Sequence, residues 1–284
     1  MAATYYPLGI RHVVDFSTAT LRPIMRIGYM ASFFVRAVCS VPVVLRHYRA
    51  ELARLVKNVT WGNGSIVVGG GTGAVIIVLG ATAGALIGIE GYNALNLMGL
   101  GPATGLISSF VSTRELAPIM AALAFAAQAG CRFTAQLGAM RIAEEIDALE
   151  TIAIRSIPYL VTTRMMASII AVLPLYVVCL GVSYVACQVV VGLAGGPSFG
   201  TYQHYFGLFL SASDIAYSVI KAVVFVLIAA TIQCYYGFYA SGGPQGVGIA
   251  AGRAMRASIT LIIVTNTLLT MAFWGVDAGA RFGG

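Results

Sequence analysis

The sequence predicts an all-α integral membrane protein, with an amphipathic N-terminal helix at the membrane interface, five transmembrane helices and one short charged helix outside the bilayer. Hydrophobic residues make up 59% of the 284 residues and charged residues only 10%, whereas soluble domains carry about 25% charged residues. A helix crosses the hydrocarbon core with ~20 apolar residues. Charge-free runs of that length occupy residues 66–89, 165–213, 222–252 and 257–276.

The N-terminal segment, residues 1–57, is basic and is expected to lie on the cytoplasmic side and in the membrane interface. Residues 21–44 read as an amphipathic helix, because Arg22, Arg26 and Arg36 share a narrow arc at the helical period. Its moderate apolarity and basic flanks favour a helix that lies in the interface over one that crosses the membrane.

The membrane body is expected to cover residues 58–276, followed by a short outer tail at 277–284. Of the 17 Lys and Arg residues, 14 fall on one side if the N-terminus is cytoplasmic. This positive-inside bias predicts a multi-pass protein of the plasma (inner) membrane with its C-terminus outside. The five spans are placed near 62–90, 103–138, 156–193, 211–240 and 250–275.

Several other classes of function are excluded or disfavoured. The net charge of +7 comes from residues that flank the spans, so we expect no nucleic-acid partner. The three histidines are scattered, which disfavours a metal site, and the five cysteines are expected to be free thiols. The only lysines are Lys57 and Lys221, so a Walker A loop is excluded. The chain is therefore not expected to be an enzyme or to hold a cofactor.

The short charged helix carries four of the ten acidic residues of the chain. Ile142, Ile146, Leu149 and Ala153 recur at helical spacing and predict an apolar edge that docks on the membrane body. The remaining surface is acidic and suits a soluble partner. The alternative is a solvated helix without a partner. The acidic residues are Glu144, Glu145, Asp147 and Glu150.

Three charges interrupt the spans at mid-membrane depth: Arg114 and Glu115 in the second span and Lys221 in the fourth. Ionisable groups at that depth usually face a cavity or a partner of opposite charge. We expect Glu115 and Lys221 to face a common cavity and to be able to pair. The alternative is a structural ion pair that only fixes helix packing.

Two glycine patterns predict close contacts or turns. Gly80, Gly84 and Gly88 recur every four residues, which lets another helix approach closely. That helix belongs either to the same chain or to a second subunit, and the sequence leaves both alternatives open. The glycines and the proline of residues 241–248 predict a tight connecting loop between the fourth and fifth spans.

Three motifs together resemble the signature of the MlaE/YrbE permease family, the membrane subunits of Mce-type ABC lipid transporters. They are Thr113-Arg114-Glu115-Leu116-Ala117-Pro118, Leu137-Gly138-Ala139-Met140-Arg141 and Glu144-Glu145-Ile146-Asp147-Ala148-Leu149. The Gly-Pro-Gln-Gly-Val-Gly stretch and the closing apolar span match too. The resemblance covers residues 20–276.

The resemblance implies a permease that works with partners. Two permease subunits would lie side by side on two cytoplasmic ATPase subunits, which would hold the ATP and magnesium, and MCE-domain proteins would bind on the outer side. A coupling helix near 141–151 would contact the ATPase, and a lipid substrate would occupy a cavity. The implied ATPase-coupling residues are Arg141, Glu144, Glu145, Asp147, Leu149 and Glu150, and the implied cavity residues are Arg114, Glu115 and Lys221.

The chain also departs from the family pattern. Gln128 stands where an arginine is usual, Gln136 stands where a glutamate is usual, and Arg132 is additional. A homodimer would lose these charges twice, so we expect a heterodimer with a second, unlike YrbE-like permease. Two other functions stay open: a proton-driven secondary transporter with Glu115 as the carrier, and a membrane anchor for envelope proteins that does not transport.

Overall fold

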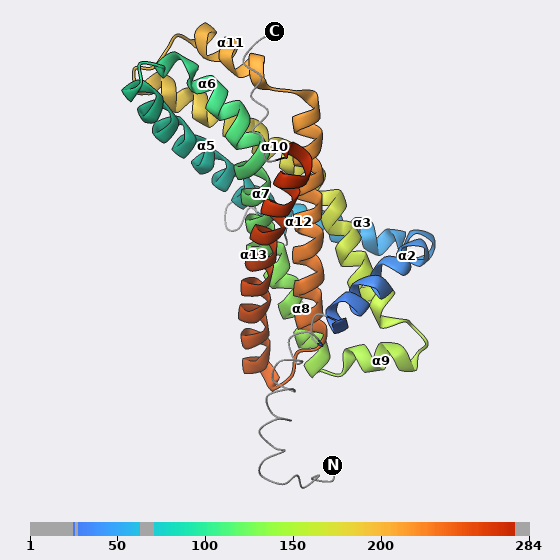
Figure 1. Ribbon diagram of the computed structural model, residues 1–284. Coiled ribbons are helices and arrows are strands. Elements are labelled where there is room, and N and C mark those ends of the chain that lie inside the picture. Colours follow the sequence, from blue (N-terminus) through green and yellow to red (C-terminus); the bar gives the residue numbers. More distant parts are fainter. Residues whose placement is uncertain (1–24, 26–27, 63–70, 276–284) are drawn as a thin grey trace, which may run out of the picture.

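The computed structural model describes residues 25, 28–62 and 71–275, and within these ranges the chain is helical without strands. The predicted all-α membrane fold is confirmed. The predicted 277–284 tail and parts of the first 57 residues lie outside the described ranges. The α-helices, shown in Figure 1, are α2 (Val41–His47), α3 (Arg49–Trp61), α5 (Gly71–Leu97), α6 (Thr104–Ile107), α7 (Ala117–Phe125), α8 (Cys131–Ile142), α9 (Glu145–Thr151), α10 (Thr163–Leu193), α11 (Phe199–Phe209), α12 (Ala212–Phe238) and α13 (Gly243–Trp274).

Within the described residues, six helical segments are long and apolar enough to cross a membrane. Five of them correspond to the five predicted spans. The other, Gly28–His47, is the segment that the sequence places in the interface. This segment is bent, because a turn at Ser40 separates residues 28–39 from α2. In Figure 1, α3 lies across the long axis of α12 and α13.

The second span is not a regular α-helix. It runs from Gly101 to Ile142 and contains two π-helical segments, Ser108–Leu116 and Ala126–Gly130. The last part of this span, α8, packs against α12 and α13, and the preceding helix α7 packs against α5. The largest cluster of buried apolar side chains forms where α8, α10 and α12 meet, and it includes Phe133, Leu137 and Phe225.

The glycines of α5 lie against α10 of the same chain. A Cβ atom added at Gly84 would lie 2.0 Å from the carbonyl oxygen of Ser183. At Gly80 the added atom would lie 2.8 Å from Sγ of Cys179, and Gly88 meets the next turn of α10 in the same way. The absence of side chains therefore lets the two backbones approach closely. Of the two alternatives left open by the sequence, the structure has the contact within the chain.

Two predicted connections are helical, which corrects the sequence interpretation. Residues 243–248 are not a loop but the first turns of α13, because Pro244 stands in the first turn, where its missing N–H costs nothing. The connection at 192–213 contains α11, whose N-terminus is capped by the Ser198 side chain accepting from the Thr201 N–H. The first span also continues beyond Glu90 to Leu97.

Candidate functional site

The π-helical segment Ser108–Leu116 carries Arg114 and Glu115 of the second span. A π-helix is wider than an α-helix and occurs often at functional sites. Here Arg114 and Glu115 are neighbours in sequence but reach different partners. Arg114 pairs with Asp214 at the start of α12, while Glu115 pairs with Lys221 two turns further along the same helix.

Glu115 and Lys221 form an ion pair, with 3.3 Å between Nζ and Oε1. The Lys221 side chain is fully buried and the Glu115 side chain is 32% exposed. The lysine also donates to the Arg114 carbonyl and, at 2.9 Å, to the Thr270 hydroxyl. A buried ammonium needs such acceptors, because its desolvation is costly. The structure thus brings together the two charges that the sequence expects to pair.

The last span, α13, completes the coordination of Glu115. Asn266 donates through Nδ2 to Oε2 at 2.6 Å, and the Thr270 hydroxyl donates to Oε1 at 2.6 Å. Asn266 and Thr270 lie four residues apart and so share one face of the helix. One carboxylate therefore joins the second, fourth and fifth spans.

A second pair lies toward the beginning of α12. Arg114 Nη2 and Asp214 Oδ2 are 3.2 Å apart, and both side chains are nearly buried. The Trp274 indole donates to the other Asp214 oxygen at 2.6 Å. The guanidinium also lies over the Phe110 ring at 3.9 Å from its centroid, a favourable cation–π geometry. The two ion pairs together leave the cluster with no net charge.

Sequence reasoning identified Arg114, Glu115 and Lys221 but missed the other members of the cluster. Asp214 was visible as the charge that ends the apolar run at Ser213. Asn266 and Thr270 carry no charge, and their only signal is the spacing of four residues within an apolar span. We call Arg114, Glu115, Asp214, Lys221, Asn266, Thr270 and Trp274 the charge cluster.

The short charged helix exists as α9 but is separated from α8. Glu144 adopts a left-handed conformation, with φ of 57°, and this breaks the helix. Ile146 is buried and Leu149 packs against the main core. Ile142 and Ala153 are exposed. The predicted apolar edge is therefore only half correct, because the break turns Ile142 away from the face that Ile146 occupies.

The acidic residues of α9 lie on its outer surface. Glu144, Glu145, Asp147 and Glu150 are exposed. Arg141, in the last turn of α8, forms an ion pair with Asp147 at 2.7 Å between Nη1 and Oδ1. The carboxylates of Glu144 and Glu145 form no ion pair with the residues that the structure describes. They stand at the start of the helix, where the helix dipole favours negative charge.

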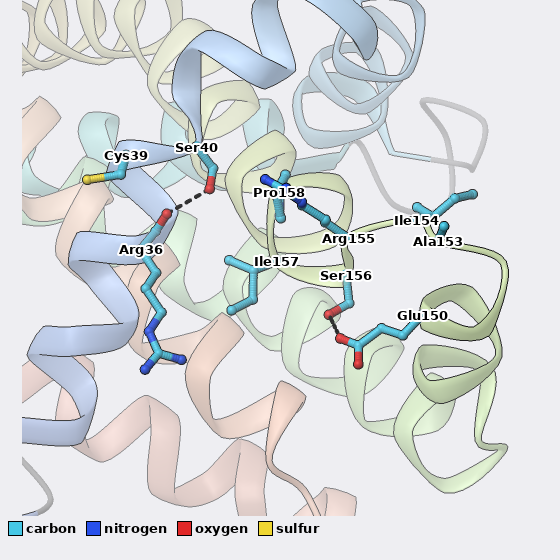
Figure 2. Close-up of a pocket in the computed structure, with 10 residues that line it drawn as sticks. All are labelled: Arg36, Cys39, Ser40, Glu150, Ala153, Ile154, Arg155, Ser156, Ile157 and Pro158. Carbon is cyan, nitrogen blue, oxygen red and sulfur yellow. Dashed lines mark hydrogen bonds between the residues drawn. The ribbon is translucent and has the colours of Figure 1, made fainter.

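A cavity of about 480 Å³ lies between the connection after α9 and the N-terminal helix. Figure 2 shows that Glu150 faces Ser156, whose hydroxyl donates to the carboxylate. Arg36 and Ser40 line the opposite side. The end of α9 is thus fastened to the segment that leads into α10.

Of the three residues that depart from the family pattern, Arg132 and Gln136 lie on α8 and line one cavity. Arg132 donates through Nη2 to the carbonyl of Asn58 at 2.8 Å. Gln136 accepts from Nη2 of Arg164 at 3.4 Å. Gln128 is half-buried and lies in the π-helical segment Ala126–Gly130, which precedes α8.

Residues 63–272 match the family model described as Permease MlaE. The chain belongs to the MlaE permease family. It is 32% identical over 201 residues to a protein of Rickettsia bellii named a probable ABC transporter permease protein. The aligned region covers 68% of this chain and 74% of that protein. A probable ABC transporter permease protein of Synechocystis is 32% identical over 175 residues, 58% of this chain and 63% of that protein. The chloroplastic protein trigalactosyldiacylglycerol 1 of Arabidopsis thaliana is 29% identical over 177 residues, 62% and 51% of the two chains.

Membership of the MlaE family identifies the chain as a multi-span membrane permease. The matched region contains α9 and every member of the charge cluster except Trp274. The resemblance stated from the sequence motifs is confirmed at the level of the family. The roles of individual residues stay predictions.

Proposed function

We propose that this chain is the permease subunit of an ATP-driven Mce-type transporter that moves lipids or fatty acids across the cell envelope. The observation that carries the proposal is α9, a short acidic helix at one end of an MlaE-family membrane body. The name of the Arabidopsis relative refers to a lipid, trigalactosyldiacylglycerol, and this supports a lipid as the substrate.

In this proposal α9 is the coupling helix. Its exposed Glu144, Glu145 and Asp147 contact a cytoplasmic ATPase, while Ile146 and Leu149 transmit its movement to the core of the permease. ATP and magnesium are held by the ATPase subunits. The switch is a rigid-body shift of helix groups, a common form of conformational change.

The charge cluster is proposed to border the lipid pathway. Glu115 has the most exposed charged side chain of the cluster, so its carboxylate is the charged group that a lipid or a second subunit would reach first. The pathway would lie between this chain and a second, unlike permease, with MCE-domain proteins on the outer side. The complex would sit in the inner membrane with the N-terminus of this chain in the cytoplasm.

The heterodimer rests on Gln128 and Gln136, which replace charged residues of the family pattern. It is tested by purifying the tagged chain under native conditions and identifying the co-purified permeases by mass spectrometry. A second, unlike permease in stoichiometric amount is the expected result. A complex that contains this permease alone contradicts the heterodimer.

Two alternative functions are weaker. A proton-driven carrier would need a Glu115 carboxylate that is free to exchange partners, yet Lys221, Asn266 and Thr270 all bond to this carboxylate. A passive membrane anchor has no need for two ion pairs within its spans, which are costly to insert.

The proposal is tested by replacing Glu144, Glu145 and Asp147 together with lysine. The variant is expected to insert into the membrane normally but to lose both its ATPase subunit and lipid uptake, because the contact surface changes sign. Glu90→Lys, an exposed carboxylate on α5, serves as the control and should retain both. Lipid uptake that persists without the ATPase would support the proton-driven alternative instead.

A further inference from the structure

A small cavity of about 150 Å³ lies between α3 and α8, apart from the charge cluster and from α9. Its walls are partly apolar and partly able to donate hydrogen bonds. Arg132 from α8 is the charged member of the lining. The cavity is lined by Leu55, Asn58, Val59, Arg132, Phe133 and Gln136.

A second arginine bonds to Gln136, one of the residues that line this cavity. Arg164 of α10 is 7% exposed. It donates to the Leu160 carbonyl at 2.7 Å and to the Gln136 side chain at 3.4 Å. Its Nε has no hydrogen-bond partner among the described residues. Burying a guanidinium that bonds only to neutral acceptors costs free energy, because no bonded carboxylate offsets its desolvation.

Carboxylates of the described residues do not neutralise either arginine. Glu51 of α3 attracts Arg164 from a distance, but its carboxylate is ion-paired with Arg54 at 3.6 Å. Arg132 uses Nη2 for the Asn58 carbonyl, and its Nε has no partner among the described residues. Gln136 lies one helical turn from Arg132 and touches Arg164, so both cations flank the same neutral side chain.

Helix α3 has the pattern of a helix that lies at a membrane surface. Its apolar residues Leu52, Leu55 and Val59 are buried against the membrane body, whereas Arg54 is exposed. Trp61 at its end is 60% exposed, and tryptophan is enriched at the level of lipid headgroups. The cavity under α3 therefore lies at the depth where lipid phosphates are found.

We propose that the cavity between α3 and α8 binds the phosphate of an anionic phospholipid, with Arg132 as its cationic ligand. The positive charge of Arg164, which bonds to Gln136 of the cavity lining, adds to the attraction for the phosphate. Guanidinium groups bind phosphate through paired, charge-assisted hydrogen bonds. The apolar walls at Leu55 and Val59 suit the start of the lipid chains. This site is separate from the transported lipid, so it does not depend on the proposed function.

The test measures binding to the purified complex in neutral detergent, by native mass spectrometry and thermal shift. The probes are short-chain phosphatidylglycerol, short-chain phosphatidylcholine and inorganic phosphate. Phosphatidylglycerol is expected to bind at least about tenfold more tightly than either of the others, and Arg132→Gln to weaken it about tenfold. Arg256→Gln, which removes an exposed arginine of α13, should leave the affinity unchanged.

Gln136→Glu provides a second variant that does not remove a packed side chain. Its carboxylate would neutralise Arg164, so the variant should melt at a higher temperature without lipid and bind phosphatidylglycerol more weakly. Binding that is equal in Arg132→Gln and the parent protein would overturn the site. Equal effects of phosphatidylglycerol and inorganic phosphate would overturn the lipid as its ligand. Lipid transport is not a readout, so failure of the transport proposal would leave these results interpretable.

Discussion

Lys221 and Glu115 lie 3.3 Å apart across 106 residues of sequence, with the lysine fully buried and the glutamate one-third exposed. The asymmetry means that the lysine depends on the glutamate more than the reverse, because only the carboxylate is accessible at the surface of the chain. Thr270 bonds to both charged groups, so the pair also fixes the position of α13.

Glu115→Lys is expected to place two cations side by side and to reduce the unfolding free energy by about 3 kcal/mol, the lower end of the cost of breaking a buried ion pair. Lipid uptake should fall with it. The double variant Glu115→Lys with Lys221→Glu restores opposite charges and should recover part of both. Thermal unfolding in detergent and uptake in cells measure the two effects, and Glu90→Lys is the control. An unaffected Glu115→Lys variant would show that the charge cluster has no role.

Gly84→Ala is expected to separate α5 from α10, because the added methyl group would meet the Ser183 carbonyl. Overpacking of this kind costs about 1–3 kcal/mol. Gly181→Ala is a matched control on α10, since a Cβ there has nothing within 4 Å. The melting temperature should fall for the first variant only. Equal melting temperatures would contradict the close contact between the two helices.

Glu144→Gly is expected to stabilise the protein slightly, by about 0.5 kcal/mol, because glycine adopts the left-handed conformation of this residue without strain. Ala148→Gly, inside α9, should have the opposite effect and cost about 1 kcal/mol. Thermal unfolding shows whether each variant is more or less stable than the parent protein. Destabilisation by both would mean that residue 144 is helical and that α8 continues into α9.

The sequence predicted the five spans well, because crossing a bilayer demands long apolar runs that few other structures use. It predicted the ends of these spans less well. The proline and glycines after Ser241 have a high turn propensity, which predicts a loop. Pro244 also suits the first turn of a helix, however, and α13 begins there. The composition of this stretch alone does not distinguish a loop from the start of a helix.

The candidate site was predictable only where charge made it visible. Glu115 and Lys221 stand out because ionisable residues are rare in spans. Asn266 and Thr270 resemble ordinary polar residues of a span, and their contact with Glu115 depends on the rotation of α13 about its axis, which distant packing decides. The break at Glu144 had no signal, since glutamate has no preference for positive φ.

The most direct test of the account is a photo-crosslink from α9 in the native complex. Glu145, an exposed residue in the first turn of α9, is replaced by p-benzoylphenylalanine. In the control, Glu90, an exposed residue in the second half of α5, is replaced in the same way. The account predicts that irradiation joins position 145, and not position 90, to a subunit that carries an ATP-binding site, as identified by mass spectrometry. A complex in which position 145 yields no such adduct, or in which position 90 does, would contradict it.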